Sequence, residues 1–583
     1  MTGGSFIIPS DYIAGNNKNE VFTVHNLTEE QHLIAQAIRE FMDREVLPNL
    51  VEIEKKNFAL TRLLLAGLGD LGALGLEVPE EYGGLDLGAV ASAITCEELA
   101  RQASFAVSAM AHAGIGTLPI KLYGTEEQKK KYLPLLVSGK YIGAYCLTED
   151  IAGSDANAVK TTAVLSEDKS HFVLNGQKKF VTNCNFADVY TVFAQASTHD
   201  GQKLGLTAFI VERVFKGISC GEEEHKMGIQ GSSTAYLYLD NVKVPAENVL
   251  GELGGGFKMA VTVLNLGRFK LAAACLGGIR EALKDSVSYA KERKQFGKPL
   301  SDFGAIRYKL AQMYASAYEV EVIVYRTAGH LEQSVRSVDA KDSKAVLRAI
   351  DEFVIECSLA KVLCSEALDF IVDENVQIHG GSGYCESLAE RAYHDSRINR
   401  IFEGTNEINR MLAVGMLLRK SVKGSLPLIK IAKKLFDEVM SMPVGMASEP
   451  DTVAEKMRGY LDNAKKAVIL LIGAAMQRFT DELPNKQVLL MKLSDCLINI
   501  YILDSVLESY PKDTDDRNED VMRFIFFSRL LALDGLLRET VPMCVEGDML
   551  RTSLMMLRRF TKFDSENLME LTDSIAEKVL ARV

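Results

Sequence analysis

The stretch Ile401-Phe402-Glu403-Gly404-Thr405-Asn406-Glu407-Ile408 places one carboxylate at a turn, directly before a glycine and a new helix. Thr405 and Asn406 are capping residue types, and helical spacing follows at Ile408, Met411, Leu412 and Gly415. A carboxylate at a turn can project toward a bound substrate, which suits a catalytic base. Taken alone, the stretch also fits a surface glutamate near a helix N-terminus, where the helix dipole favours negative charge.

The length and composition describe a large globular protein. The chain has 583 residues, of which 47% are hydrophobic and 25% charged, so we expect several domains or one multi-layer enzyme. The net charge of −12 and the lack of a basic tract disfavour nucleic-acid binding. The ten cysteines are scattered without a Cys-x-x-Cys pair, which indicates reduced, mostly buried thiols. We predict no disulfide framework and no metal site.

Two segments of the chain bear on its location. Residues 1–10 have neither a basic segment before an apolar run nor Arg-rich amphipathic character, so they resemble neither a secretory signal nor an organelle presequence. We expect a bacterial cytoplasmic protein, with a mitochondrial matrix location as the alternative. At the start of the C-terminal helical region, a predicted helix carries Lys430, Lys433 and Lys434 on one face. That helix is more typical of ordinary packing, but it also allows a weak peripheral membrane contact.

The hydrophobic period changes along the chain. Helical spacing over residues 1–140 predicts a helical N-terminal domain, in which Thr28 and Gln31 form a capping-box pattern. Over residues 141–255 the period is that of strands, and Asn175-Gly176 between two apolar runs predicts a β-hairpin. We expect this second region to be an antiparallel β-domain closed as a barrel.

Helical spacing then returns and continues to the end of the chain. Long helices are predicted at residues 257–293, 302–333, 341–374 and 406–419, which suggests a four-helix bundle domain over residues 256–420. Residues 421–583 are expected to form a C-terminal helical extension. The predicted fold is therefore mainly α, with a central β-barrel between a helical N-terminal domain and a four-helix bundle.

A second stretch with candidate functional residues, 145–155, lies where helical spacing gives way to the spacing of strands. Thr148 and Ser154 offer hydroxyl groups, and Gly153 allows backbone N–H groups to approach a phosphate or the edge of a flavin ring. A simple turn explains the Gly and the Ser but not the whole string.

Five motifs, in order, resemble those of the acyl-CoA dehydrogenase family. The first is Cys146-Leu-Thr-Glu-x-x-Ala-Gly-Ser-Asp-x-x-Ala158. The others are Phe180-Val-Thr-Asn183, Arg293-Lys-Gln-Phe-Gly297, Gln377-Ile-His-Gly-Gly-Ser-Gly383 and Phe402-Glu-Gly-Thr405. The resemblance covers roughly residues 28–419. The family fold is a helical domain, a β-barrel and a four-helix domain, in agreement with the domains expected from periodicity.

The resemblance implies FAD as the cofactor, held by residues from several parts of the chain. Phe180 and Thr182 would flank the flavin, with Phe180 standing where the family usually has Trp, and Thr405 and Glu407 would complete the site. The first motif with its preceding tyrosine would contribute Tyr145, Leu147, Thr148, Gly153 and Ser154. The pyrophosphate and adenosine would be held across a subunit interface by Arg293, Gln295, Phe296, Gln377, Gly380 and Gly381.

The resemblance also implies an acyl-CoA substrate. Arg268 matches a substrate-binding arginine, and Leu264-Asn265-Leu-Gly-Arg-Phe269 looks like the very-long-chain branch, whose members also carry a C-terminal helical extension. The implied substrate-binding residues are Ser154, Asn265, Arg268, Phe402 and Gly404. We therefore expect action on long or very long acyl chains in fatty acid β-oxidation.

The family pattern implies a mechanism with Glu403 as the base. Glu403 would remove the α-proton of the thioester while the β-hydrogen leaves as hydride to flavin N5, giving a trans-2-enoyl-CoA. The thioester carbonyl would be bound by the Glu403 N–H and a flavin ribityl hydroxyl, which stabilises the enolate-like transition state. A dry, apolar pocket should raise the pKa of the carboxyl toward the working pH.

The partners implied are an electron-transferring flavoprotein as electron acceptor and a second copy of the chain. We expect a homodimer, because the C-terminal extension would pack on the core where a second dimer sits in tetrameric relatives. Two alternatives stay open. One is an acyl-CoA oxidase that uses oxygen, and the other is an extended homologue that acts mainly as an assembly or scaffold protein.

Overall fold

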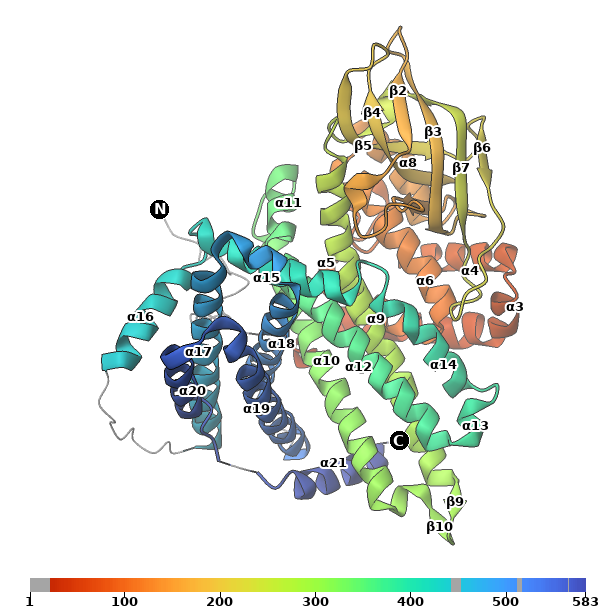
Figure 1. Ribbon diagram of the computed structural model, residues 1–583. Coiled ribbons are helices and arrows are strands. Elements are labelled where there is room, and N and C mark those ends of the chain that lie inside the picture. The colour runs from red at the N-terminus through yellow and green to blue at the C-terminus, as the bar shows by residue number, and fades with distance from the viewer. Residues whose placement is uncertain (1–20, 442–451, 511–515, 565, 583) are drawn as a thin grey trace.

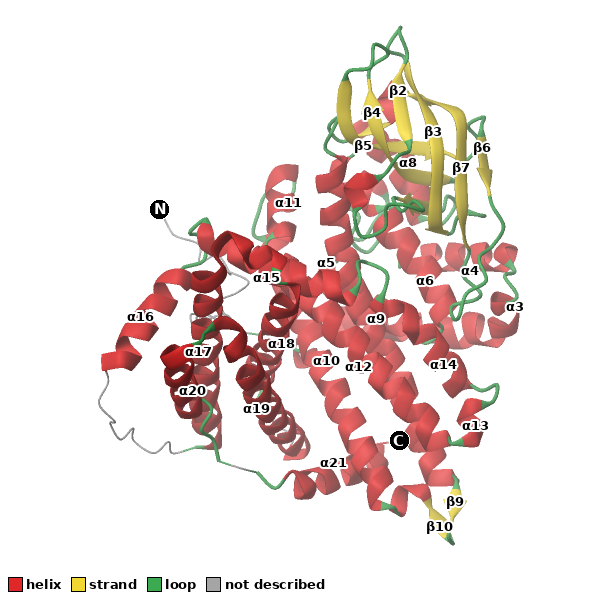
Figure 2. Cartoon of the chain, viewed as in Figure 1, coloured by secondary structure: helices red, strands yellow, loops and turns green. Residues whose placement is uncertain are grey.

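The computed structural model describes residues 21–441, 452–510, 516–564 and 566–582. Residues 1–20 of the predicted N-terminal domain lie outside this range. The fold is mostly helical, and a sheet domain stands at one end of it (Figure 2). A central group of long helices lies between this sheet domain and the helices of the C-terminal extension (Figure 1).

The N-terminal part is helical, as predicted. Its first helix starts at the predicted capping box, because Thr28 Oγ1 accepts from Gln31 N at 3.2 Å and Gln31 Oε1 accepts from Thr28 N at 2.9 Å. The helices of this part are α2 (Glu29–Phe41), α3 (Leu50–Glu54), α4 (Phe58–Asp70), α5 (Gly88–Leu99), α6 (Ala103–Ala111), α7 (Leu118–Tyr123) and α8 (Glu126–Val137).

The β-domain is a mixed eight-stranded sheet with the order β6-β7-β3-β2-β4-β5-β8, and β1 pairs with β4. The strands are β1 (Gly143–Cys146), β2 (Thr162–Leu165), β3 (His171–Thr182), β4 (Val189–Ser197), β5 (Lys203–Glu212), β6 (Ile218–Cys220), β7 (Thr234–Pro245) and β8 (Val249–Leu250). Strands β1 and β2 run parallel to β4, so the prediction of a purely antiparallel domain is wrong. The strand order is open between β6 and β8, and the predicted barrel is not confirmed.

The predicted hairpin at Asn175-Gly176 is also wrong. Strand β3 runs straight through both residues and pairs with β7 along its length, from His171 opposite Pro245 to Thr182 opposite Thr234. The register shifts between Leu174 and Gly176, so the dipeptide forms a β-bulge instead of a turn. At Gly176 φ is +147°, and a Cβ atom there would lie 2.6 Å from Thr161 Oγ1, which explains the glycine.

The central helices are α9 (Gly256–Glu292), α10 (Gly304–Arg336), α12 (Val354–His379) and α15 (Asn406–Val422), close to four of the predicted ranges. The predicted helix at 341–374 is two helices, α11 (Ser343–Asp351) and α12, because the backbone breaks at Phe353. Shorter elements complete this part, namely β9 (Lys294–Gln295), β10 (Lys298–Pro299), α13 (Gly381–Tyr384) and α14 (Leu388–Ser396). The stretch Ala103–Tyr123 and α9 are long and apolar enough to cross a membrane, but both are mostly buried as core helices.

The C-terminal extension is helical and packs on the central helices. It contains α16 (Leu428–Ser441), α17 (Val453–Phe479), α18 (Gln487–Ser509), α19 (Asp516–Cys544), α20 (Gly547–Phe560) and α21 (Leu568–Arg582). Helix α18 contacts α10, α12 and α15, and α21 returns to α10. A buried ion cluster fixes this junction, because Asp504 of α18 binds Arg326 of α10 at 2.8 Å and Lys465 of α17 at 2.5 Å.

Candidate active site

Glu403 lies in a sharp turn at the start of α15, as predicted. Its φ is +58° and that of Gly404 is +82°, so two successive residues adopt the left-handed region that a glutamate rarely enters. Thr405 caps α15 by accepting from the N–H of Ile408 at 3.3 Å. The turn therefore leads directly into α15, and the Glu403 side chain projects from the bend.

Three buried donors hold the carbonyl groups of this turn. Arg268 Nε of α9 donates to the Glu403 carbonyl at 3.1 Å. Lys361 Nζ of α12 and Asn409 Nδ2 of α15 both donate to the Gly404 carbonyl, at 2.9 and 2.7 Å. The unusual backbone conformation of Glu403 is therefore fixed from three helices, as expected where a fold maintains local strain for function.

The carboxyl group of Glu403 has the surroundings of a poised base. Its Oε2 atom is buried and has no hydrogen-bond partner among the described residues. Burial raises the pKa of Glu403 to about 7, while the nearby charges of Arg268 and Lys361 act in the opposite direction. A carboxyl group with this pKa exists in both protonation states near neutral pH, which suits proton abstraction.

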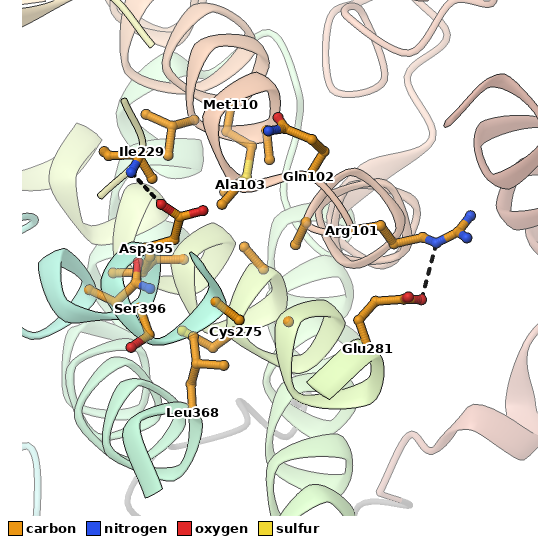
Figure 3. Close-up of a pocket in the computed structure, with 18 of the residues that line it drawn as sticks. Arg101, Gln102, Ala103, Met110, Ile229, Cys275, Glu281, Leu368, Asp395 and Ser396 are labelled. Atoms are coloured by element: carbon orange, nitrogen blue, oxygen red, sulfur yellow. Dashed lines mark hydrogen bonds and ion pairs between the residues drawn. The ribbon is translucent and has the colours of Figure 1, made fainter. Parts of the chain in front are cut away.

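Glu403 opens on a cavity of about 350 Å³ between the N-terminal helices and α9. Figure 3 shows Met110 and Ala103 on one side of this cavity and Cys275 and Leu368 on the other. Most of the lining is apolar and much of it is small, including Ala106, Val107, Ala111, Leu271, Ala274, Gly278 and Ala282. A hydrocarbon chain matches this lining in polarity.

Two polar contacts lie in the cavity wall. Asp395 accepts a hydrogen bond from the backbone N–H of Ile229, and burial raises its pKa to about 6. At another edge of the cavity, Arg101 Nε donates to Glu281 Oε1 at 3.1 Å (Figure 3). These pairs connect the β-domain and N-terminal helices to the central helices around the cavity.

The cofactor residues predicted in the β-domain gather partly around this site. Thr182, at the end of β3, lines the same cavity as Glu403. Tyr145 of β1 has a buried hydroxyl without a described hydrogen-bond partner, and burial together with the charge of Glu403 raises its pKa. Phe180 is 57% exposed and has a φ of +55°, so its ring is presented on the surface of the sheet. Gly153 and Ser154 are exposed in the loop after β1.

A buried ion pair organises the loop that carries Leu147 and Thr148. Lys178 of β3 is fully buried and bonds Glu149 Oε1 at 2.7 Å and the Leu147 carbonyl at 3.3 Å. The backbone N–H of Lys179 donates to the Thr148 carbonyl at 2.8 Å. Strand β3 therefore fixes this loop against the sheet, beside the exposed Phe180.

The remaining predicted FAD residues lie elsewhere in the chain. Arg293, Gln295 and Phe296 form the exposed β9–β10 hairpin at the far end of α9 from the sheet domain (Figure 1). Gln377, Gly380 and Gly381 are exposed at the C-terminal end of α12. The two groups are neighbours, because Tyr289 of α9 stacks on His379 of α12 with ring centroids 4.0 Å apart. A single copy of the chain therefore does not bring this set together with Thr182 and Glu403.

The predicted substrate residues divide in the same way. Phe402 lines the cavity beside Glu403, and Arg268 and Gly404 are part of the turn. Asn265 is fully buried and donates to the Ile350 carbonyl of α11 at 3.2 Å, so its amide is directed toward α11. Ser154 lies in the loop of the β-domain. Glu407, which was predicted to contact FAD, is exposed in the first turn of α15.

Comparison with known proteins decides the family. Models of the acyl-CoA dehydrogenase N-terminal, middle and C-terminal domains match residues 28–140, 144–242 and 254–417. A further acyl-CoA dehydrogenase C-terminal domain matches residues 463–559. The chain belongs to the acyl-CoA dehydrogenase family. It is accordingly a flavoprotein oxidoreductase that uses FAD, and the predicted resemblance is confirmed.

Three relatives illustrate the extent of the similarity. A probable acyl-CoA dehydrogenase of Bacillus subtilis is 41% identical, over 97% of this chain and 96% of the relative. The mitochondrial very long-chain specific acyl-CoA dehydrogenase of Rattus norvegicus is 37% identical, over 76% of this chain and 69% of the relative. A crystal structure of an acyl-CoA dehydrogenase complexed with FAD from Bacillus anthracis has a TM-score of 0.93 and 41% identity, with 99% of both chains covered.

The residues of this acyl-CoA dehydrogenase fit a flavin beside Glu403. Tyr145 and Glu403 present buried polar atoms without described partners at one site, and Thr182 faces the same cavity. At Gly153 no described heavy atom lies within 4 Å of where a Cβ atom would stand, so the loop leaves room for a ligand. The exposed ring of Phe180 adds an aromatic surface next to this loop.

The sequence interpretation did not identify two residues that position the turn. Lys361 and Asn409 hold the Gly404 carbonyl, and neither belongs to a motif. Lys361 did leave a signal, because it is a lone cation within the apolar stretch 353–364 of a buried helix, and a buried lysine needs a specific acceptor. Asn409 has no recognisable signal in the sequence, because an asparagine in the first turns of a helix can have many roles.

Proposed function

We propose that this acyl-CoA dehydrogenase converts long or very long chain acyl-CoA to trans-2-enoyl-CoA in fatty acid β-oxidation, with Glu403 as the α-proton-abstracting base. The observation that carries the proposal is the buried Oε2 of Glu403, which has no hydrogen-bond partner among the described residues and lies in the wall of a mostly apolar cavity. A base in a dry site at the head of an acyl-binding cavity suits removal of a weakly acidic proton next to a thioester.

The residues around Glu403 set its orientation and its protonation state. Arg268 and Lys361 fix the turn through its carbonyls, so the carboxylate is held in position before substrate enters. The pKa of about 7 makes Glu403 a stronger base than an exposed glutamate while part of it remains ionised. Bound FAD supplies the acceptor for the β-hydrogen, which leaves as hydride. Thr182, Tyr145 and the loop at 147–154 would hold its flavin part.

The length of the cavity supports long substrates. Helix α9 lines it from Gly267, beside Glu403, to Asp285, a separation of about 27 Å at about 1.5 Å per residue. Each carbon of an extended acyl chain adds less than one C–C bond of about 1.5 Å, so a sixteen-carbon chain spans less than about 24 Å. Small residues on both walls leave this path open, and the very-long-chain relative at 37% identity agrees with such a preference.

The exposed half of the predicted FAD set supports a homodimer. Arg293, Gln295, Phe296 and the end of α12 lie at the far end of the central helices from the sheet domain. They can contact the same FAD as Thr182 only if a second copy of the chain supplies them. The electron acceptor proposed is an electron-transferring flavoprotein, in keeping with the family resemblance.

An anaerobic titration with palmitoyl-CoA, followed by flavin absorbance, tests the reaction. The expected result is bleaching of the parent enzyme and none in Glu403→Gln, with palmitoyl-CoA still bound. Bleaching of the Glu403→Gln variant would overturn the role of Glu403. A yellow parent that binds palmitoyl-CoA without bleaching would overturn the substrate class, and rapid reoxidation in air would favour an oxidase.

The chain-length preference is tested by Ala274→Phe. Ala274 lines the cavity about 10 Å along α9 from Gly267. The larger side chain is expected to lower kcat/KM for palmitoyl-CoA while leaving butyryl-CoA unaffected, which makes butyryl-CoA the internal control. Equal losses with both substrates would show that the acyl chain does not follow α9.

A further inference from the structure

The catalytic turn is connected to the C-terminal extension by an unbroken series of polar contacts. The series starts at Gly404, whose carbonyl accepts from Lys361 Nζ at 2.9 Å. Lys361 Nζ also donates to Asn406 Oδ1 at 2.7 Å, and Asn406 Nδ2 donates to Glu366 Oε1 at 3.0 Å. These groups come from α12 and α15, the two helices that flank the turn.

The series continues into α18 of the extension. Arg410 of α15 makes a two-pronged contact with Glu366, with Nη1 and Nη2 at 2.7 and 2.8 Å from its carboxylate oxygens. Its Nε donates to Asp495 Oδ1 of α18 at 2.7 Å. One guanidinium group thus joins α12, α15 and α18, in the planar bidentate geometry that restricts an arginine most strongly.

The burial along the series explains how a distant carboxylate can affect the turn. Lys361 and Asn406 are almost fully buried, and the Arg410 side chain is 12% exposed, so these groups have few alternative partners. The two carboxylates of the series are partly exposed, with 41% of the Glu366 side chain and 32% of the Asp495 side chain accessible, and Asp495 is the outermost member. Releasing Asp495 frees one side of Arg410, and the change passes through Glu366 and Asn406 to the lysine that holds Gly404.

We propose that Asp495 of the C-terminal extension is a positioning residue for Glu403. Its carboxylate fixes Arg410, and through this contact series it maintains the backbone of the catalytic turn. The extension then has a role in turnover as well as in packing. This inference rests on the proposed function of Glu403 as the base.

The test compares Asp495→Asn with a control substitution that removes another polar contact made by α18. Glu539→Gln removes a contact of 2.8 Å between Lys492 of α18 and Glu539 of α19, which lies wholly within the extension. Each FAD-loaded full-length variant is assayed with palmitoyl-CoA and an artificial electron acceptor. Asp495→Asn is expected to lower kcat by about threefold to thirtyfold with KM unchanged, a range typical of mutations along coupled networks. Asp495→Glu should restore part of kcat, and Glu539→Gln should match the parent.

A double-variant comparison makes the proposal falsifiable even if Asp495→Asn is less stable. If the series carries the effect, adding Asp495→Asn to Asn406→Ala produces no further loss of kcat. Full kcat in Asp495→Asn would overturn the inference. The same fractional loss of kcat on adding Asp495→Asn to the parent and to Asn406→Ala would overturn it as well. An active Glu403→Gln would instead remove the proposed function on which it rests.

Discussion

Gly267 lies directly against the carboxylate of Glu403. A Cβ atom on Gly267 would lie 2.7 Å from Glu403 Oε2 and 2.9 Å from its Cδ. Carbon and oxygen atoms do not approach so closely without displacement, so the glycine makes room for the base. The space beside α9 that Glu403 occupies therefore depends on position 267 as well as on the turn at 401–404.

Replacing this glycine should impair the base without removing it. In Gly267→Ala the methyl group pushes the carboxylate away, and a displacement of about 1 Å lowers kcat by about a hundredfold. Turnover per bound FAD with palmitoyl-CoA measures the effect. Gly415→Ala is the control, because no described heavy atom lies within 4 Å of a Cβ atom there. That change should preserve kcat, and unchanged turnover in Gly267→Ala would contradict the packing argument.

The rate should depend on pH through Glu403. Only the ionised carboxylate removes a proton, and the pKa of Glu403 is raised to about 7 by burial. kcat/KM with palmitoyl-CoA is therefore expected to fall about tenfold per pH unit below about 7 and to level off above it. Stopped-flow measurement of flavin reduction across pH 5 to 9 checks this.

Glu356 provides the control for that profile. It lies in α12, burial raises its pKa to about 7 as well, and it does not line the cavity. Glu356→Gln should leave the pH profile in place if Glu403 is the titrating group. If the pH profile shifts in Glu356→Gln and is unchanged in active variants near Glu403, the titrating group is Glu356 and not Glu403.

Glu356 should instead affect stability. Both of its carboxyl oxygens are buried and have no hydrogen-bond partner in the described part of the chain. Because its folded pKa lies above the ordinary value of a glutamate, its contribution to folding is fully present below about pH 4.5 and is lost as the pH rises toward 7. Glu356→Gln should therefore gain about 2 kcal/mol relative to the parent between pH 5 and pH 8. Urea unfolding at the two pH values measures this, and a pH-independent difference would contradict it.

Local chemistry made several parts of the fold predictable. The caps at Thr28 and Thr405 depend on residues three positions apart, and the structure contains both. The position of Glu403 follows from its own turn and the helix after it. Helical periodicity likewise marks α9 within one residue at each end, because its apolar positions face one continuous core.

The failures arise where contacts between distant residues decide the outcome. Asn175-Gly176 has the best short hairpin pattern in the chain, yet β7 pairs across it and converts it to a bulge. The parallel pairing of β1 and β2 with β4 joins strands that are separated along the chain by β3, and strand periodicity does not show which strands pair. The contact between Arg410 and Asp495 joins residues 85 positions apart, and no local pattern marks it.

The proposed homodimer gives the last prediction. Phe296 is 95% exposed with a φ of +51° at the tip of the β9–β10 hairpin, an unfavourable position for a large apolar side chain unless another surface covers it. If a second copy supplies that surface and completes its FAD site with this hairpin, Phe296→Asp should weaken dimerisation and lower the FAD content together. Sedimentation velocity and the ratio of flavin to protein absorbance measure both. Val214→Asp is the matched control, because Val214 is 84% exposed on the β-domain and belongs to no predicted FAD set. A Phe296→Asp protein that stays dimeric with full FAD would show that the hairpin does not contribute to a neighbouring site.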